Sequence, residues 1–161
     1  MIISNSSTLI LIAKVSLLNA FLKNYGAIHI SKVVFDEVSS KNLFENLMIK
    51  KEYNNGNIVI KDIDKKEYYG LLREFRIGEG EASIFVLCNK YKDCLILTDD
   101  KKLITLCRLE KKNFASSMAI VVRMYEEKLI DKKTAIEKLD KLFAYGRYTI
   151  ELYEYFKGQV M

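Results

Sequence analysis

The stretch Leu95-Ile96-Leu97-Thr98-Asp99-Asp100 decides how this chain is interpreted. Three apolar residues stop at Thr98, two acids follow, and a lysine-rich amphipathic segment begins at Lys101. This order is typical of a buried parallel strand that ends at the mouth of an α/β sheet. Ligands of such sheets bind just beyond the carboxyl ends of the strands. The two acids therefore either belong to a metal site or cap the helix that follows.

Composition limits the class of protein. The chain has 161 residues, half of them hydrophobic, which is enough for one domain with a full-sized core. We therefore expect residues 1–161 to form a single domain. The formal net charge of +5 is compatible with a nucleic-acid partner but is only a weak indication of one. The single histidine, His29, excludes a histidine-rich zinc site, so catalysis would depend on carboxylates, hydroxyls or lysines.

Cysteine usage and the N-terminus predict the compartment. The three cysteines, Cys88, Cys94 and Cys107, are odd in number and form no C-x-x-C pair, so we expect reduced and mostly buried thiols. The N-terminus lacks the basic region and the cleavage-like site of a secretory signal peptide. The apolar run from Thr8 to Ala13 is too short to span a membrane. We therefore expect a cytoplasmic protein with no membrane partner.

Short apolar strands alternate with amphipathic segments along the whole chain. Strands are expected at residues 2–4, 28–30, 58–60, 95–98 and 114–115. Helical segments are expected at residues 9–14, 15–25, 32–38, within 39–57, and at 64–75, 81–89, 101–110, 118–128, 132–145 and 148–156. This alternation predicts an α/β domain with a mostly parallel sheet.

Polar side chains gather where the predicted strands end. They are Asn5 past the first strand, Glu37 in the helix after the second, Glu81 at the head of an apolar helix, and Asp99 with Asp100 past the fourth strand. In a parallel sheet these positions can converge on one edge. Oxygen-rich clusters of this type hold Mg²⁺ or Mn²⁺, and such a cation can activate water and stabilise charge on a phosphate.

Motifs at these positions resemble, in order, those of the PIN domain family, and of its small prokaryotic branch in particular. The segment Ile3-Ser4-Asn5-Ser6-Ser7-Thr8-Leu9-Ile10 is similar to a strand and turn of the type VSNSSPLI. Gly78-Glu79-Gly80-Glu81-Ala82 matches a GEGEA segment, and Thr98-Asp99-Asp100 matches an aspartate pair after a hydrophobic strand. A late GR turn is matched by Gly146-Arg147.

The resemblance implies a three-layer α/β/α sandwich and a metal-dependent nuclease, commonly an RNA-cleaving toxin that is paired with an antitoxin. It places the four acidic positions of the family on Asn5, Glu37, Glu81 and Asp100. The candidate ligands of Mg²⁺ or Mn²⁺ are then Glu81, Asp100, Glu37 and Asp99, and the candidate RNA contacts are Lys101, Lys102 and Ser6. We also expect a homodimer, with the late aromatic residues serving as core or dimer contacts.

One position departs from the family pattern, and it defines the alternative function. Asn5 carries an amide where the family has a carboxylate, so one negative charge is missing and the affinity for metal should be lower. The alternative is a weakened or inactive PIN-like module that binds RNA or protein. Other assignments stay open: Asp99 and Asp100 can cap a helix, Asn5 can be a plain capping residue, and Glu79 competes with Glu81.

Overall fold

The computed structural model describes residues 1–161 as a five-stranded sheet and ten helices. The strands are β1 (Ile2–Ser4), β2 (Ile28–Ser31), β3 (Ile58–Lys61), β4 (Leu95–Leu97) and β5 (Asn113–Ala115). They pair in the order β3-β2-β1-β4-β5, and every pairing is parallel. The helices are α1 (Ser6–Lys14), α2 (Leu18–Tyr25), α3 (Lys32–Ser39), α4 (Phe44–Asn54), α5 (Lys65–Glu74), α6 (Glu79–Asn89), α7 (Lys101–Leu109), α8 (Ser117–Glu126), α9 (Lys132–Tyr145) and α10 (Ile150–Val160). The predicted parallel α/β sheet is confirmed.

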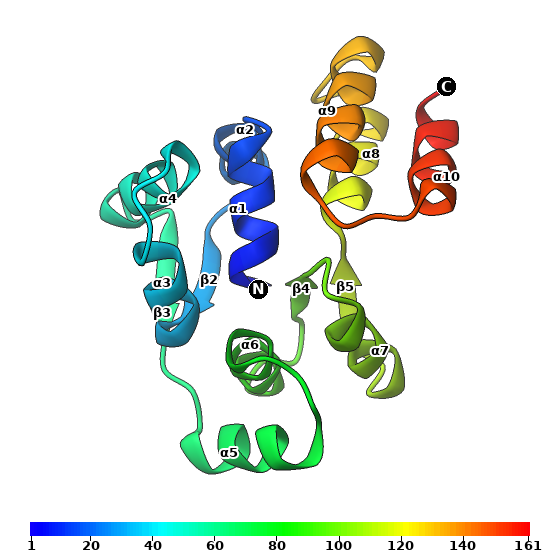
Figure 1. The fold of residues 1–161 in the computed structure, drawn as a ribbon. Coiled ribbons are helices and arrows are strands. Elements are labelled where there is room, and N and C mark those ends of the chain that lie inside the picture. Colours follow the sequence, from blue (N-terminus) through cyan, green and yellow to red (C-terminus); the bar gives the residue numbers. More distant parts are fainter.

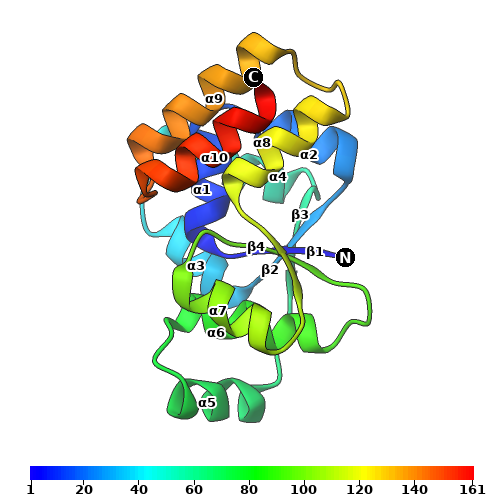
Figure 2. The same cartoon turned by 90° about the vertical axis from the view of Figure 1, so that its right-hand side faces the viewer.

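The helices cover both faces of the sheet and complete three layers (Figures 1 and 2). One face carries α1, α2, α4 and the C-terminal group α8 to α10, and the other carries α5, α6 and α7. The change of face follows from the strand order, because the chain moves outward from β1 to β3 and then returns to β4 on the other side of β1. Right-handed crossovers in opposite directions place their helices on opposite faces. The predicted three-layer sandwich is confirmed.

The core lies between the sheet and the two helical layers. Ile3, Ile28 and Ile96 of the central strands are fully buried, as expected for strands that are covered on both faces. Helix α6 packs against β1, β2 and β4, and every residue from Gly80 to Cys88 except Glu81 is buried. This central position explains why α6 is apolar almost all round instead of along one stripe.

Side-chain caps set most of the helix starts in this proline-free chain. Each capping side chain accepts a hydrogen bond from the backbone N–H three residues later, a geometry that satisfies a free donor of the first turn. The caps are Asn5, Ser31, Asp64, Asp100, Ser116, Asp131 and Thr149. The Thr149 cap corrects one prediction, because the last helix begins at Ile150 and not at Tyr148, and it continues to Val160.

The cysteines differ from the prediction of three reduced thiols. Cys88 and Cys94 are paired as a disulfide, with their Cα atoms 5.7 Å apart. The prediction is wrong for this pair because the turn from the end of α6 into β4 brings the two side chains together, which their spacing in the sequence did not reveal. Cys107 is buried and free, as predicted, and burial raises the pKa of its thiol to about 11.

The first two helices meet at a sharp break. Ser16, between α1 and α2, has a φ of 61°, in the left-handed region. Neither these helices nor any other single helix is long and apolar enough to cross a membrane, although α1 and α2 would pass by length and composition if joined across their 110° bend. Leu9, Ile12 and Leu18 of this pair are buried in the core.

Candidate active site

The carboxyl ends of β1 and β4 meet where the strand order reverses. The two strands are in register with Ser4 opposite Leu97, so the residues that follow, Asn5 and Thr98, lie side by side. The backbone N–H of Asn5 continues the ladder and donates to the Leu97 carbonyl at 3.3 Å. The crevice outside such a reversal is the general ligand-binding position of open parallel sheets. The structure therefore brings the predicted site positions after these two strands together.

A cleft of about 500 Å³ opens at this edge of the sheet. Glu81, Asp99 and Asp100 contribute its acidic lining. The rest of the lining comes from α1, from the end of α9 and from the connection between α9 and α10: Ser7, Ile10, Leu11, Lys14, Tyr145, Gly146, Arg147 and Tyr148. The cleft therefore joins acidic groups at the sheet to residues from both ends of the chain.

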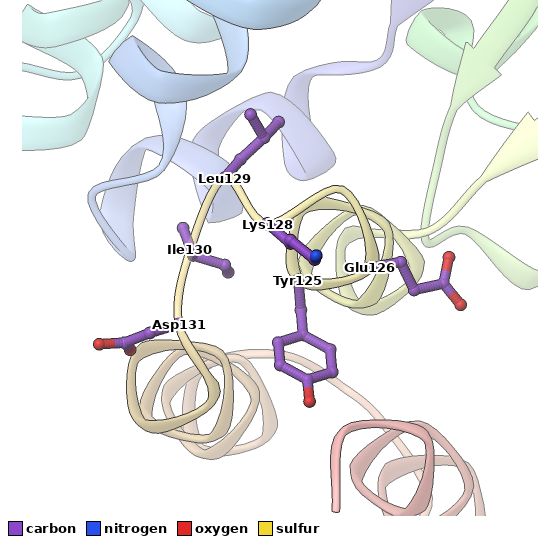
Figure 3. A pocket seen from close by; sticks show the side chains of 6 residues that line it. All are labelled: Tyr125, Glu126, Lys128, Leu129, Ile130 and Asp131. Carbon is purple, nitrogen blue, oxygen red and sulfur yellow. The ribbon is translucent and has the colours of Figure 1, made fainter.

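A second hollow, of about 520 Å³, lies at the turn between α8 and α9 (Figure 3). All of its lining residues fall within the single segment 125–131. Figure 3 shows Tyr125 and Leu129 pointing in opposite directions and Glu126 pointing outward. Because binding sites need polar groups that converge, we assign the candidate site to the cleft at the sheet edge.

Glu81 is the central acid of the cleft. It lies in the first turn of α6 and is half-buried. Burial raises the pKa of its carboxyl group; the hydrogen bond from its own backbone N–H opposes this shift, and the charges of Asp100 and Glu37 add to it. None of the ion pairs of the protein involves any of these three acids. The charges of Asp100 and Glu37 therefore both act on Glu81, and none of the three acids is held in an ion pair.

Glycine at position 80 lets Glu37 approach α6. Helix α3 lies at the carboxyl edge, where it contacts both α1 and α6 (Figure 1). A Cβ atom on Gly80 would lie 2.8 Å from Oε2 of Glu37, so a larger residue would displace the carboxylate. The same Oε2 accepts a hydrogen bond from the hydroxyl of Ser6. The GEGEA segment thus supplies the acid Glu81 and the space for Glu37.

The two neighbouring aspartates have different surroundings. Asp100 caps α7, with Oδ1 accepting from the Leu103 backbone N–H at 2.8 Å, and Oδ2 accepts no hydrogen bond from the protein. Asp99 accepts from four donors: the Thr8 hydroxyl at 2.9 Å, the Ser117 backbone N–H at 3.0 Å, the Tyr148 hydroxyl at 2.6 Å and the Ser117 hydroxyl. Asp99 therefore ties α1, α8 and the α9–α10 connection to the end of β4, whereas Asp100 keeps a free oxygen.

Replacing Tyr148 by phenylalanine tests this network. The change removes one donor to a partly buried carboxylate, so we expect the free energy of unfolding to fall by about 1.5–3 kcal/mol. Burial and the charge of Asp99 raise the pKa of the Tyr148 phenol, so it remains a donor at neutral pH. Urea unfolding measures the loss. Tyr155→Phe, at an exposed position, is the control, and equal stability of the two variants would contradict the assigned role.

Asn5 is fully buried, and both polar atoms of its side chain form hydrogen bonds within the protein. Its Oδ1 accepts from the Thr8 backbone N–H at 3.0 Å, which caps α1. Its Nδ2 donates to the Thr98 hydroxyl at 3.0 Å, and the same hydroxyl accepts from the Asp100 backbone N–H at 3.1 Å. The capping role left open by the sequence is thus present, and Asn5 also positions Asp100 through Thr98.

The acids at this edge of the sheet are the candidate ligands of a divalent cation. No group of three or more acidic, histidine or cysteine side chains surrounds a common point. Glu81 is bonded to its own backbone, Glu37 to Ser6 and Asp100 to Leu103. The chemistry nevertheless fits, because carboxylate oxygens are the ligands of hard cations and a cation would offset both the burial and the neighbouring negative charges that raise the pKa of Glu81.

The predicted RNA contacts lie outside the lining of the cleft. Ser6 lies against Glu37, Lys101 is exposed, and the Lys102 ammonium group donates to the Arg76 carbonyl at 2.9 Å. The basic residues that do line the cleft are Lys14 and Arg147. Nothing in the sequence distinguished Lys14 from the other lysines, and Arg147 was visible only as part of a family-like turn.

A family model described as PIN domain matches residues 1–157. No curated protein and no solved structure matches. The matched region contains every candidate site residue and all five strands. The chain therefore belongs to the PIN domain family, whose fold is typical of nucleases.

Proposed function

We propose that this protein is an endoribonuclease that depends on Mg²⁺ or Mn²⁺. The observation that carries the proposal is the acidic cluster of Glu37, Glu81 and Asp100 at the switch point of the sheet, in which no acid forms an ion pair. Clustered carboxylates with no basic partner are costly unless they bind a cation. Membership of the PIN domain family supports a nuclease as the class of enzyme.

Each residue of the cluster has a role in this proposal. Glu81, Asp100 and Glu37 would hold the cation, which when bound would activate water and stabilise charge on the phosphate. Asn5 holds the Thr98 hydroxyl, which in turn holds the backbone of Asp100. We assign Asp99, a candidate ligand in the sequence, to positioning, because both of its oxygens already accept hydrogen bonds.

The biological setting is part of the same proposal. As a toxin, the protein would act on RNA in the cytoplasm, be paired with an antitoxin and form a homodimer; these points rest on the family resemblance. One feature supports a protein partner: Leu43, Phe44 and Leu47, at the start of α4, are at least half exposed. Neighbouring exposed apolar side chains of this kind are typical of protein-binding surfaces.

A second function is favoured by Asn5. With an amide at this position the site has lost one carboxylate, and the amide is fully used in capping α1 and bonding Thr98. The protein would then bind RNA or a protein partner without cleaving it. A test of catalysis separates the two candidates.

The test is cleavage of an end-labelled single-stranded RNA in Mg²⁺ or Mn²⁺, with a chelator as control. We expect cleavage that stops with the chelator and is strongly reduced in Glu37→Gln, because Glu37 is exposed and its loss removes a ligand without disturbing the core. Glu154→Gln, on the exposed side of α10, is the matched control. No cleavage in any cation would favour the binding module, whereas equal cleavage by both variants would exclude Glu37 as a ligand of the catalytic cation.

A further inference from the structure

Two basic side chains line the cleft with no acidic partner. Lys14 lies at the end of α1 and Arg147 in the α9–α10 connection, and both are exposed. Neither forms an ion pair or a side-chain hydrogen bond. They share the cleft with Glu81 and Asp100, which also lack a charged partner. A ligand that suits both the basic and the acidic side chains must present negative charge to Lys14 and Arg147 and must coordinate a metal ion beside Glu81 and Asp100.

A tyrosine ring lies beside Lys14 in the lining of the cleft. Tyr145, the last residue of α9, is 49% exposed. The Lys14 ammonium group lies 4.5 Å from the centroid of this ring, within the range of a cation–π contact. The ring thus positions Lys14 and still offers aromatic surface to a ligand.

The α9–α10 connection is held in place on the acidic side of the cleft. The Tyr148 hydroxyl donates to Asp99 at 2.6 Å, which anchors the connection to the end of β4. Gly146 permits this path, because a Cβ there would lie 2.9 Å from the Leu142 carbonyl and would overlap the Tyr148 ring. Arg147 is therefore carried between two fixed neighbours, Gly146 and Tyr148, and does not sit on a free loop.

We propose that Lys14, Tyr145 and Arg147 form a binding wall for single-stranded RNA, with the two cations on backbone phosphates and the tyrosine stacked on a base. The proposal rests on the proposed function for the class of ligand, RNA. Cationic grooves that carry exposed aromatic rings bind single strands in this way. A base can stack on Tyr145 only when it is free of the duplex stack, so the wall selects unpaired segments.

Binding of an end-labelled oligouridylate, followed by fluorescence anisotropy in a chelator at low salt, tests the wall without requiring catalysis. We expect Arg147→Gln and Lys14→Gln each to weaken binding by roughly fivefold or more, and to lower the salt slope by about 0.7 for each lost phosphate contact. Tyr145→Ala should weaken binding by about fivefold or more, and Tyr145→Phe, which keeps the ring, should bind like the parent. Arg73→Gln, at an exposed position on α5, a helix that contributes no residue to the lining of the cleft, is the matched control.

The outcomes separate this inference from the proposed function. Binding by Arg147→Gln and Lys14→Gln equal to that of Arg73→Gln would overturn the wall, and cleavage by the parent would then still support the nuclease. Loss of binding in these variants, with no cleavage in any cation, would support the wall and overturn the nuclease. A hairpin duplex that binds as tightly as the oligouridylate would also overturn the wall, because paired bases cannot stack on Tyr145.

Discussion

Replacing Glu81 by glutamine should abolish RNA cleavage and, at neutral pH, make the protein more stable. Cleavage is lost on the proposed function, because glutamine removes a negative charge from the centre of the acidic cluster that would hold the cation. A catalytic cation contributes several kcal/mol to the transition state, and each 1.36 kcal/mol is tenfold in rate. We therefore expect a loss of about 100-fold or more in the cleavage rate.

The gain in stability follows from the sign of the pKa shift. The pKa of Glu81 is raised in the folded protein, by burial and by the charges of Asp100 and Glu37, so its ionisation is harder in the folded than in the unfolded chain. This cost is absent below the unfolded pKa, grows as the pH rises toward the raised folded pKa, and is complete above it. Glu81→Gln removes the cost, so its melting temperature should exceed that of the parent at pH 7 and the difference should vanish in acid.

Two measurements check this pair of effects. Thermal unfolding in a chelator, from acid to neutral pH, gives the stability difference, and the labelled-RNA assay gives the rate. Glu154→Gln, at an exposed position on α10, should match the parent in both. A Glu81→Gln protein that is less stable than the parent at neutral pH would show that the carboxylate is compensated, and the argument for a cation would fail.

Replacing Asn5 by aspartate should strengthen metal binding and raise the cleavage rate. It should also destabilise the metal-free protein, and binding of the cation should restore most of the lost stability. In a chelator we expect a loss of about 1–3 kcal/mol, because the donor to the Thr98 hydroxyl disappears and a charge is placed at a fully buried position. The cap on α1 is retained, since a carboxylate oxygen can still accept from the Thr8 backbone N–H. The added charge attracts the cation, and an affinity gain of roughly tenfold or more is expected.

Unfolding of Asn5→Asp with and without Mg²⁺ measures the loss of stability in the metal-free protein and its recovery when the cation binds. A cation at one hundred times its dissociation constant stabilises the folded state by about 2.7 kcal/mol, which is enough to cancel most of the loss. The double variant Asn5→Asp with Glu81→Gln should lose the recovery, which ties it to the acidic cluster. If Asn5→Asp neither binds Mg²⁺ more tightly nor cleaves faster, Asn5 does not face the metal position and its role is confined to the fold.

The strand ends could be predicted from the sequence, because they depend on local pattern. The apolar run before Asp99 and the polar turn at Asn5 locate the carboxyl edge of a parallel sheet without any knowledge of long-range contacts. The order of the motifs, through the family resemblance, identified Glu37 and Glu81 as further candidate site residues. Gly80, which reads as part of a motif, gained its physical reason only when Glu37 was seen against it.

The different surroundings of Asp99 and Asp100 could not be predicted. They depend on donors from Thr8, Ser117 and Tyr148, which approach Asp99 from three separate parts of the chain. The same is true of Lys14, whose place in the cleft is set by the return of the chain between α9 and α10. Such contacts leave no periodicity in the sequence, because they join elements that pack together only in the finished fold.

The position of β1 at the centre of the sheet has a consequence for the order of assembly. This strand is the first to leave the ribosome, yet one of its two neighbours, β4, is made only after the whole of β2, β3 and their helices. The bond between Asn5 and Thr98 spans 93 positions, and long loops of this kind close late in folding. A nascent chain therefore cannot form the cleft before β4 and the helices that follow it have been synthesised. If the protein cuts RNA, the ribosome that makes it is exposed to a working site only once the C-terminal helices have emerged and Tyr148 has reached Asp99.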